Sequence, residues 1–315
     1  MNDEDLSGGE SAPAPWSAPP GYRSGFVALV GRANVGKSTL MNRLVGAKLS
    51  IVSDVPQTTR FPVRGVLHRE GCQVVFIDTP GIHKPRYRMN EEMVQMSTRV
   101  LKEVDLVAVL VDAADGIGPG DRFVFDLLRQ SGTRSLLLLN KIDRMAKEKL
   151  LPILQETGEL GLFEEIVPVS ARTGDNCDRL KRLLLERMPP GPPHFPPEML
   201  TDLPERLAMA ELIREQLFLQ TRQEVPHSSA VVIEAVDTDP SGLVRIRSTI
   251  YVDKESQKGI VIGEGGAMMK AIGTAARHAL EGLLHARVHL ALWVKVREGW
   301  RDDLALLRLL GLPPP

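Results

Sequence analysis

The sequence contains little that would mark a secreted or membrane-spanning chain. Cysteine occurs twice among 315 residues, as Cys72 and Cys177, both in segments typical of an intracellular enzyme, so we expect reduced thiols. No window approaches the roughly 18 apolar residues that cross a bilayer, and no basic N-terminal segment precedes a long apolar run. These absences predict a cytoplasmic protein that is neither secreted nor membrane-spanning.

An excess of charge is missing as well. The chain has 39 Lys and Arg against 40 Asp and Glu, which gives a formal net charge of -1 at pH 7. This balance of charge gives no indication of a nucleic-acid partner. A basic surface that binds nucleic acid would therefore have to be confined to one part of the chain.

Length and composition predict two domains. Residues 1–24 are rich in Ser, Pro, Gly, Ala and acidic residues, so we expect a disordered tail. Residues 25–188 alternate apolar runs with amphipathic segments, which predicts an α/β domain whose mostly parallel sheet has helices on both faces. The proline-dense residues 189–203 are expected to be a semi-rigid linker, followed at 204–315 by a smaller α+β domain with a C-terminal helix.

The patterns also place individual elements. The expected strands of the first domain lie at residues 26–30, 74–78, 106–112, 135–140 and 166–169. Ligands bind at the carboxyl ends of strands in open α/β sheets, so we expect a site there. In the second domain we expect a helix over 204–219, strands over 229–236 and 243–252, helices within 259–283, a strand over 288–296 and a short helix ending near 310.

A phosphate-binding loop of the form G-x-x-x-x-G-K-S follows the first expected strand, where residues 31–38 read GRANVGKS. Its glycines let backbone amides wrap phosphates, and the next helix presents its positive end to the same anion. Lys37 would bridge the β- and γ-phosphates, and the Ser38 hydroxyl would ligate Mg²⁺. The expected nucleotide contacts are Gly31, Arg32, Ala33, Asn34, Val35, Gly36, Lys37, Ser38 and Thr39.

A second phosphate-side motif, DTPG, occupies residues 78–81 after an apolar run. Asp78 can reach Mg²⁺ through water, and the Gly81 amide can touch the γ-phosphate, whose loss frees the loop. We expect nucleotide contacts from Asp78, Thr79, Pro80, Gly81 and Ile82.

The base-recognition motif is NKID, at residues 140–143. Asp143 can accept two hydrogen bonds from guanine, whereas adenine would leave its carboxylate unpaired, which favours GTP over ATP. Asn140 and Lys141 would fix the loop and cover the base. The triplet Ser170, Ala171 and Arg172 follows a short expected strand, so it can offer a backbone amide to the guanine carbonyl.

Three further segments resemble one family. They read QTTR at 57–60, DTPGIHKP at 78–85 and SQKGIVIGEGG at 256–266, and they are similar to the Era family of bacterial ribosome-assembly GTPases over nearly all of 25–312. The resemblance implies that QTTR is the first switch. It also implies that Thr59 supplies a hydroxyl to Mg²⁺ only when GTP is bound, with Thr58 as the alternative.

Hydrolysis is expected to be slow. The residue after DTPG is Ile82, where many signalling GTPases carry a glutamine that orients water. An isoleucine cannot do so, which leaves Mg²⁺, Lys37 and backbone groups near Thr59 and Gly81 for catalysis. We predict intrinsic turnover of GTP to GDP and phosphate at about 10⁻⁴ to 10⁻³ per second.

Asn34 has two interpretations. In related GTPases an Asn at this loop position can bind K⁺ between the phosphates, where an arginine finger would otherwise neutralise charge, and Era-like proteins resemble that group. Alternatively, Asn34 only accommodates the loop backbone. Ala33 stands where the family usually has proline, a change that should loosen the loop without removing a ligand.

The second domain carries the G-x-x-G of a KH domain at Gly263 and Gly266. An apolar groove supplied by residues such as Ile260, Ile262 and Ile272 would accept about four bases. The expected RNA contacts are Lys258, Gly259, Ile260, Ile262, Gly263, Glu264, Gly265, Gly266, Lys270 and Arg277.

Charged and aromatic residues modify this expectation. Glu264 stands where the family usually has Lys, which weakens one phosphate contact and predicts a modest salt dependence. Basic side chains outnumber acidic ones over residues 254–301 and could line a phosphate-contacting face, or simply be solvated. Trp293 and Trp300 could stack on bases, but we interpret both as core or partly buried packing.

The resemblance implies a monomeric, GTP-dependent switch that assists assembly of the small ribosomal subunit. Its partners would be GTP or GDP, Mg²⁺, K⁺ if Asn34 binds it, and small-subunit ribosomal RNA near the 3′ end. Era-like proteins can also associate peripherally with the inner face of the membrane. The alternative is a membrane-associated signalling GTPase whose C-terminal domain binds protein rather than RNA, and an ATPase with an accidental NKID is a third hypothesis.

Overall fold

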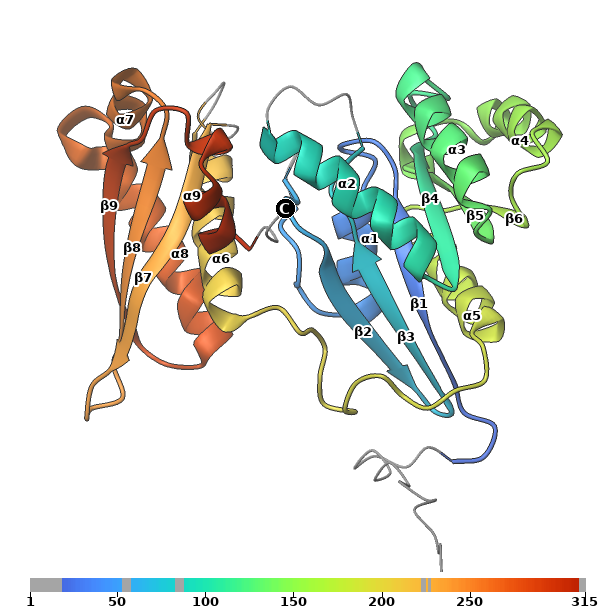
Figure 1. The fold of residues 1–315 in the computed structure, drawn as a ribbon, viewed down its shortest axis with the longest axis horizontal. Helices are drawn as coiled ribbons and strands as arrows, with labels where there is room; N and C mark the ends of the chain where they lie inside the picture. Colours follow the sequence, from blue (N-terminus) through green and yellow to red (C-terminus); the bar gives the residue numbers. More distant parts are fainter. Residues whose placement is uncertain (1–18, 53–57, 83–87, 222–224, 226–227, 312–315) are drawn as a thin grey trace, which may run out of the picture.

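The structure, a computed structural model, describes residues 19–311 except for 53–57, 83–87, 222–224 and 226–227. Most of the expected N-terminal tail therefore lies outside the described residues, as do Gln57 of the QTTR motif and part of the segment after DTPG. Two α/β units lie side by side and are joined by the segment that follows α5 (Figure 1).

The first unit is built on a six-stranded sheet with the strand order β2-β3-β1-β4-β5-β6. β2 is antiparallel to β3, and all other neighbours are parallel. In chain order the strands are β1 Arg23–Val30, β2 Val63–Arg69, β3 Cys72–Asp78, β4 Leu106–Asp112, β5 Ser135–Asn140 and β6 Glu165–Pro168. The expected α/β class with a mostly parallel sheet is confirmed.

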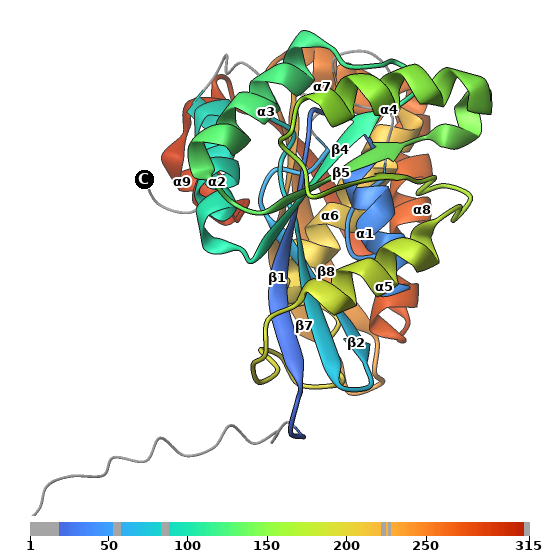
Figure 2. The same ribbon diagram turned by 90° about the vertical axis from the view of Figure 1, so that its right-hand side faces the viewer.

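Helices cover both faces of this sheet, which is why its central strands are apolar throughout. Alternate β1 residues point to opposite faces, and each face has its own buried cluster. One face packs against α1 Lys37–Val45 and α5 Cys177–Arg187. The other packs against α2 Arg88–Glu103, α3 Pro119–Ser131 and α4 Leu150–Glu159. Figure 2 shows α1 and α5 on one side of the sheet, opposite α2 and α3.

Strand β2 was not expected from the sequence. Gly65 interrupts its apolar pattern, and glycine weakens a strand prediction. A Cβ at Gly65 would lie 3.0 Å from side-chain atoms of both Leu49 and Val45 and 3.1 Å from the Met41 sulfur. The small residue thus lets α1 and the loop after it pack closely on this strand.

The proline-rich segment runs along β2 and β3 and is bound to them. The Val66 amide donates to the Leu200 carbonyl at 2.8 Å. The Gln73 side chain accepts from the His194 amide at 2.7 Å, and the Thr201 hydroxyl donates to the Arg64 carbonyl at 2.7 Å. These bonds cover the edge of the sheet, which would otherwise present unpaired backbone groups.

The second unit is a three-stranded sheet with the order β7-β8-β9. β7 and β8 are antiparallel, whereas β8 and β9 are parallel, so a crossover must connect them. α7 and α8 form this crossover, and α6 and α8 bury the inner face of the sheet. The bounds are α6 Glu205–Gln220, β7 Ser229–Thr238, β8 Val244–Val252, α7 Glu255–Ile262, α8 Ala267–Leu284, β9 Val288–Val296 and α9 Leu304–Leu309.

The two units share a buried apolar cluster. It joins Met89, Met93 and Met96 of α2 to Ala230, Val232, Trp300 and residues of α9, and α2 lies beside α9 in both ribbon views (Figures 1 and 2). Trp300 is fully buried, and its indole nitrogen donates to the Ser228 carbonyl at 3.0 Å. Trp293 is 45% exposed, so the packing interpretation holds fully for Trp300 alone.

Replacing Trp300 should therefore destabilise the whole chain. Trp300→Ala leaves a cavity between the units and removes the indole hydrogen bond, so we expect the free energy of unfolding to fall by about 3–5 kcal/mol. Denaturant unfolding followed by far-UV circular dichroism measures this change. Trp293→Ala is the matched control and should cost much less, and equal losses would contradict the assignment.

Candidate functional site

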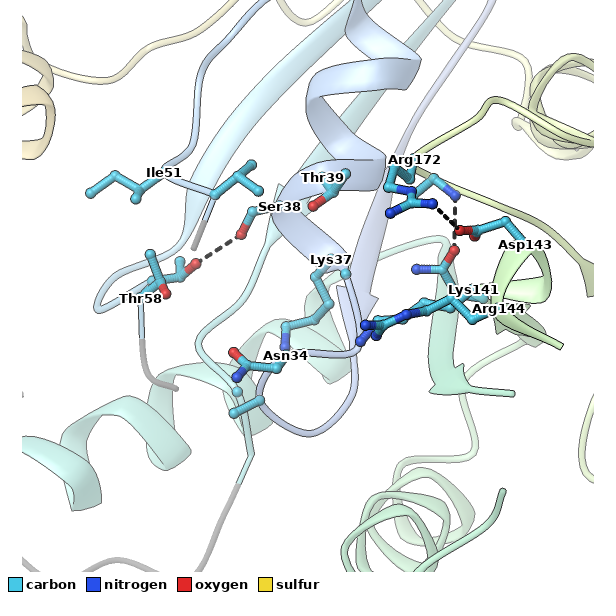
Figure 3. A pocket seen from close by; sticks show the side chains of 17 residues that line it. Asn34, Lys37, Ser38, Thr39, Ile51, Thr58, Lys141, Asp143, Arg144 and Arg172 are labelled. Carbon is cyan, nitrogen blue, oxygen red and sulfur yellow. Dashed lines mark hydrogen bonds and ion pairs between the residues drawn. The ribbon is translucent and has the colours of Figure 1, made fainter. Parts of the chain in front are cut away.

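A cavity of about 390 Å³ opens at the carboxyl ends of the parallel strands. It gathers residues from all four predicted nucleotide motifs and from the predicted first switch (Figure 3). The predicted residues that line it are Ala33, Asn34, Gly36, Lys37, Ser38, Thr39, Thr58, Thr59, Gly81, Asn140, Lys141, Asp143, Ala171 and Arg172.

The phosphate loop is closed by the side chain of Lys37. Its ammonium donates to the carbonyls of Gly31 at 3.1 Å and Arg32 at 2.9 Å. Burial lowers the pKa of Lys37 to about 8, while nearby Asp78 opposes the shift. Gly36 precedes α1 with φ 98°, and a Cβ there would lie 2.3 Å from the Asn140 amide nitrogen, so only glycine fits.

The side-chain oxygens of Ser38, Thr59 and Asp78 lie close together beside the phosphate loop. The Ser38 hydroxyl donates to Asp78 Oδ2 at 2.7 Å, and the Thr59 hydroxyl lies 3.1 Å from Ser38 Oγ and 3.3 Å from Asp78 Oδ2. Burial raises the pKa of Asp78, and Lys37 and the neighbouring hydroxyls oppose the shift. Among the described residues, Asp78 Oδ1 is a buried atom without a hydrogen-bond partner.

These residues fit Mg²⁺, which takes oxygen ligands and keeps several of its waters. Over the described part of the chain, no group of three or more His, Cys, Asp or Glu side chains could hold a metal ion unaided. An ion here would therefore share the hydroxyls of Ser38 and Thr59 with phosphate oxygens and water. Thr58 lines the same cavity.

The base-recognition segments are joined by hydrogen bonds. Asn140 donates to the Val35 carbonyl at 2.7 Å and accepts from the Ala171 amide at 2.9 Å, so one side chain connects three segments. Asp143 accepts from the Ser170 hydroxyl at 2.6 Å and pairs with the Arg172 guanidinium at 3.2 Å. Its carboxylate is thus held at one end of the cavity, where Figure 3 shows the contact with Arg172.

Several predicted residues support the cavity without lining it. Ile82 is buried, and its amide donates to the Gly31 carbonyl at 3.2 Å, so its side chain cannot hold water in the cavity. Thr79 donates through its hydroxyl to the Leu29 carbonyl. The Arg32 side chain pairs with Asp121, on α3. Pro80 also lies outside the cavity lining.

Asn34 has a left-handed φ of 63°, a conformation that Asn adopts more readily than most residues. This is the geometry that the backbone interpretation predicts. Asn34 also lines the cavity, where the K⁺ interpretation requires it to be. A comparison of GTP turnover in KCl and NaCl distinguishes the two interpretations.

Sequence reasoning missed Arg43, which lies on α1 six residues after Lys37. Its guanidinium donates to the Ala171 carbonyl at 2.5 Å and to the Arg172 carbonyl. Arg43 thereby holds the loop that carries the predicted guanine contact. Because the partners lie 128 residues apart, no local pattern could have identified this role.

The G-x-x-G segment forms a tight turn between α7 and α8. Gly263 has φ 71°, and a Cβ there would lie 2.6 Å from Met268 Cβ. Glu264 and Gly265 are exposed, as is Ile260 at 45%, whereas Ile262 is half-buried. The predicted basic contacts Lys258, Lys270 and Arg277 lie on α7 and α8, where Lys258 pairs with Glu255 and Arg277 with Glu281.

Ile272 is a correction to the predicted groove. It is fully buried in the core between α8 and the sheet, so it cannot accept bases. The apolar pattern alone could not separate a core position from a groove position on the same helix.

Arg43 should contribute to nucleotide affinity. Arg43→Met removes two charge-assisted hydrogen bonds, each worth about 1.5–3 kcal/mol when made by a charged group, so we expect the Kd for GDP to rise at least about tenfold. Preference over ATP should persist because Asp143 is unchanged. Fluorescent-nucleotide titration measures both values. Arg129→Met removes a pair on the exposed side of α3 and serves as the control, and a twofold or smaller effect of Arg43→Met would contradict the assignment.

Family models match both units. A model described as a 50S ribosome-binding GTPase matches residues 26–141, and a KH domain model matches residues 224–301. The GTPase Era of Alkaliphilus metalliredigens is 47% identical over 291 residues, which cover 92% of this chain and 99% of that protein. The GTPase Era of Heliobacterium modesticaldum is 44% identical over 289 residues, or 92% of this chain and 97% of that protein.

Solved structures match over both domains together. A single-residue variant of Aquifex aeolicus Era bound to GDP.AlF4- has a TM-score of 0.89 at 39% identity, covering 93% of this chain and all of that one. An Era in complex with MgGDPNP and nucleotides 1506–1542 of 16S ribosomal RNA has a TM-score of 0.90 at 38% identity, with the same coverage. With its nucleotide cavity and its KH domain, the chain belongs to the Era family of GTPases.

Proposed function

We propose that this chain is a GTP-dependent switch that binds small-subunit ribosomal RNA through its KH domain and assists assembly of the small ribosomal subunit. The observation that carries the proposal is the presence, in one chain, of a guanine-nucleotide cavity and an exposed G-x-x-G turn. The Era structure that contains 16S ribosomal RNA matches this chain over both parts.

The phosphate side of the cavity explains how GTP would be held. Lys37 already points across the loop, so its ammonium can exchange the carbonyls of Gly31 and Arg32 for the β- and γ-phosphates. Ser38 and Thr59 would hold Mg²⁺, with Asp78 behind them. When bound, this ion supplies charge stabilisation for the phosphoryl group that is transferred.

Water activation is left to the backbone. The buried Ile82 offers no polar group, so we expect main-chain atoms near Thr59 and Gly81 to orient the attacking water. Asp143 would accept hydrogen bonds from guanine once the base displaces Arg172 or shares the carboxylate with it. We therefore expect slow intrinsic turnover, because Ile82 cannot orient the water as a glutamine would.

The proposed RNA site depends on how closely an RNA backbone can approach the G-x-x-G turn. Gly265 and Gly266 have open space around their Cβ positions, so an RNA backbone can come close to the turn. Ile260 and Ile262 offer apolar surface to unstacked bases. The exposed Glu264 repels phosphate, so recognition should rely on bases more than on charge.

Localisation and assembly state remain predictions. Within the described residues, no helix has the length and apolarity needed to cross a membrane. Peripheral contact with a membrane, and the monomeric state, are both compatible with this fold. The rival function, a switch whose second domain binds protein, is separated from ours by the RNA experiment below.

A cation comparison tests the role of Asn34. If Asn34 binds K⁺, turnover in KCl should exceed turnover in NaCl at equal ionic strength by about tenfold, which is about 1.4 kcal/mol in the barrier. Asn34→Ala should abolish this difference. Phosphate release under saturating GTP measures it. Equal rates in the two salts would assign Asn34 to the loop backbone alone.

RNA binding tests the proposed function directly. We expect a single-stranded oligomer of the small-subunit rRNA 3′ end to bind, with an affinity that differs between GDP and a non-hydrolysable GTP analogue. Gly263→Asp should abolish binding, because its side chain adds negative charge and meets Met268. Fluorescence anisotropy reports both affinities.

The matched control for that experiment is Gly242→Asp. Gly242 also has a positive φ, of 81°, but it lies in the turn between β7 and β8 and has open space around it. This variant should bind RNA like the wild type. Absence of RNA binding by the wild type in both nucleotide states would refute the ribosomal function and favour the protein-binding rival.

A further inference from the structure

Helix α6, the first element of the second domain, presents three charged residues to the first domain. Glu211, Arg214 and Glu215 are spaced so that they share one face of the helix. Arg214 and Glu215 are almost completely buried although both carry charge. Burying a charged side chain is costly unless it is paired or hydrogen-bonded. The partners of these residues therefore show what this face of α6 holds in place.

Arg214 reaches the predicted first switch. Its side chain is 1% exposed, and its Nη2 donates to the backbone carbonyl of Thr58. Glu211 orients the guanidinium by accepting from its Nε at 2.7 Å. The guanidinium also lies 4.9 Å from the ring centre of Phe218. These contacts hold a planar donor in one orientation.

The same helix contacts the chain before the switch. Lys48, in the loop after α1, pairs with Glu215 at 2.5 Å. Lys48 and Thr58 lie on either side of residues 53–57, which the structure does not describe. α6 thus contacts the chain before the first switch through a carboxylate and the switch itself through a guanidinium.

A second arginine strengthens this attachment from the opposite direction. Arg60 is 3% exposed, donates to the Ser229 carbonyl at 2.8 Å and lies 5.2 Å from the ring centre of Trp300. The Arg60 side chain of the first switch therefore contacts the second domain, and the Arg214 side chain of the second domain contacts the first switch. Thr59, which bears the hydroxyl next to Ser38 and Asp78, lies between these two anchored positions.

We propose that Arg214 is a positioning residue for GTP hydrolysis, which the second domain supplies to the nucleotide site of the same chain. The Thr58 carbonyl and the Thr59 amide belong to one planar peptide unit, so fixing the carbonyl also fixes where Thr59 begins. Arg214 thereby keeps the Thr59 hydroxyl directed at Ser38 and Asp78. This inference rests on the proposed role of Thr59 as a Mg²⁺ ligand in the GTP state.

The test compares Arg214→Met and Arg214→Lys with the wild-type full chain. Arg214→Met should lower kcat for GTP about tenfold and raise the Mg²⁺ concentration needed for half-maximal turnover about fivefold. The Kd for GDP should change less than about twofold, because Thr59 joins the ion only with GTP. Arg214→Lys keeps one charged donor and should recover part of kcat.

Arg245→Met is the matched control, because Arg245 pairs with Asp239 on the exposed side of the second domain. It should leave kcat, the Mg²⁺ requirement and the Kd for GDP unchanged. Turnover and Mg²⁺ requirement of Arg214→Met within about twofold of the wild type would overturn the proposal. A loss of GDP and GTP binding to the same extent, without recovery by Arg214→Lys, would also overturn it, since that is what a purely structural role predicts.

Two further variants keep the test decisive. If Arg214→Met does not fold, Glu211→Gln replaces it as the test. Glu211→Gln leaves the Arg214 guanidinium in place but loosens its orientation, so kcat should fall about threefold. An unchanged kcat would then contradict the proposal. Thr59→Ala, in the same assay, separates the two hypotheses. If Thr59→Ala leaves the Mg²⁺ requirement unchanged, the proposed role of Thr59 is wrong. If Thr59→Ala raises the Mg²⁺ requirement but Arg214→Met does not, only the proposed role of Arg214 is wrong.

Discussion

The amide side chain of Asn140 is the contact on which the nucleotide cavity depends. It donates to the phosphate loop at Val35 and accepts from the guanine-side loop at Ala171, so phosphate and base recognition keep a fixed separation. Its close approach is also what excludes a side chain at position 36. Because both bonds are buried, losing either would leave an unpaired polar group in the core, which is costly.

Around this contact the fold places each motif by topology. β1, β3, β4 and β5 are parallel neighbours, so the segments that follow them converge at one edge of the sheet. Arg43 then joins α1 to the guanine-side loop, and Arg214 joins α6 to the first switch. Two loops that line the cavity are therefore held by side chains that do not line it themselves, one of them from the second domain.

The parts predictable from sequence are those whose chemistry is local. The phosphate loop, NKID and the G-x-x-G turn each combine a glycine or polar residue with neighbours a few positions away, so a short window contains the whole argument. Arg43 and Arg214 could not be found this way, because their partners lie 128 and 156 residues distant. Ile272 was misplaced because groove and core are both apolar, and β2 was missed because Gly65 breaks its pattern.

The attachment of the proline-rich segment limits how the two domains can move. Asp202 still pairs with Arg64 of the first domain, and α6 begins at Glu205, so only Leu203 and Pro204 lie between the two. Two extended residues span about 7 Å. If the interface around Trp300 opens, the second domain is tethered at this point and can swing about it as on a hinge. The effective concentration of the second domain beside the first switch then stays high even when the interface is open. The second domain can therefore rebind without a diffusional search.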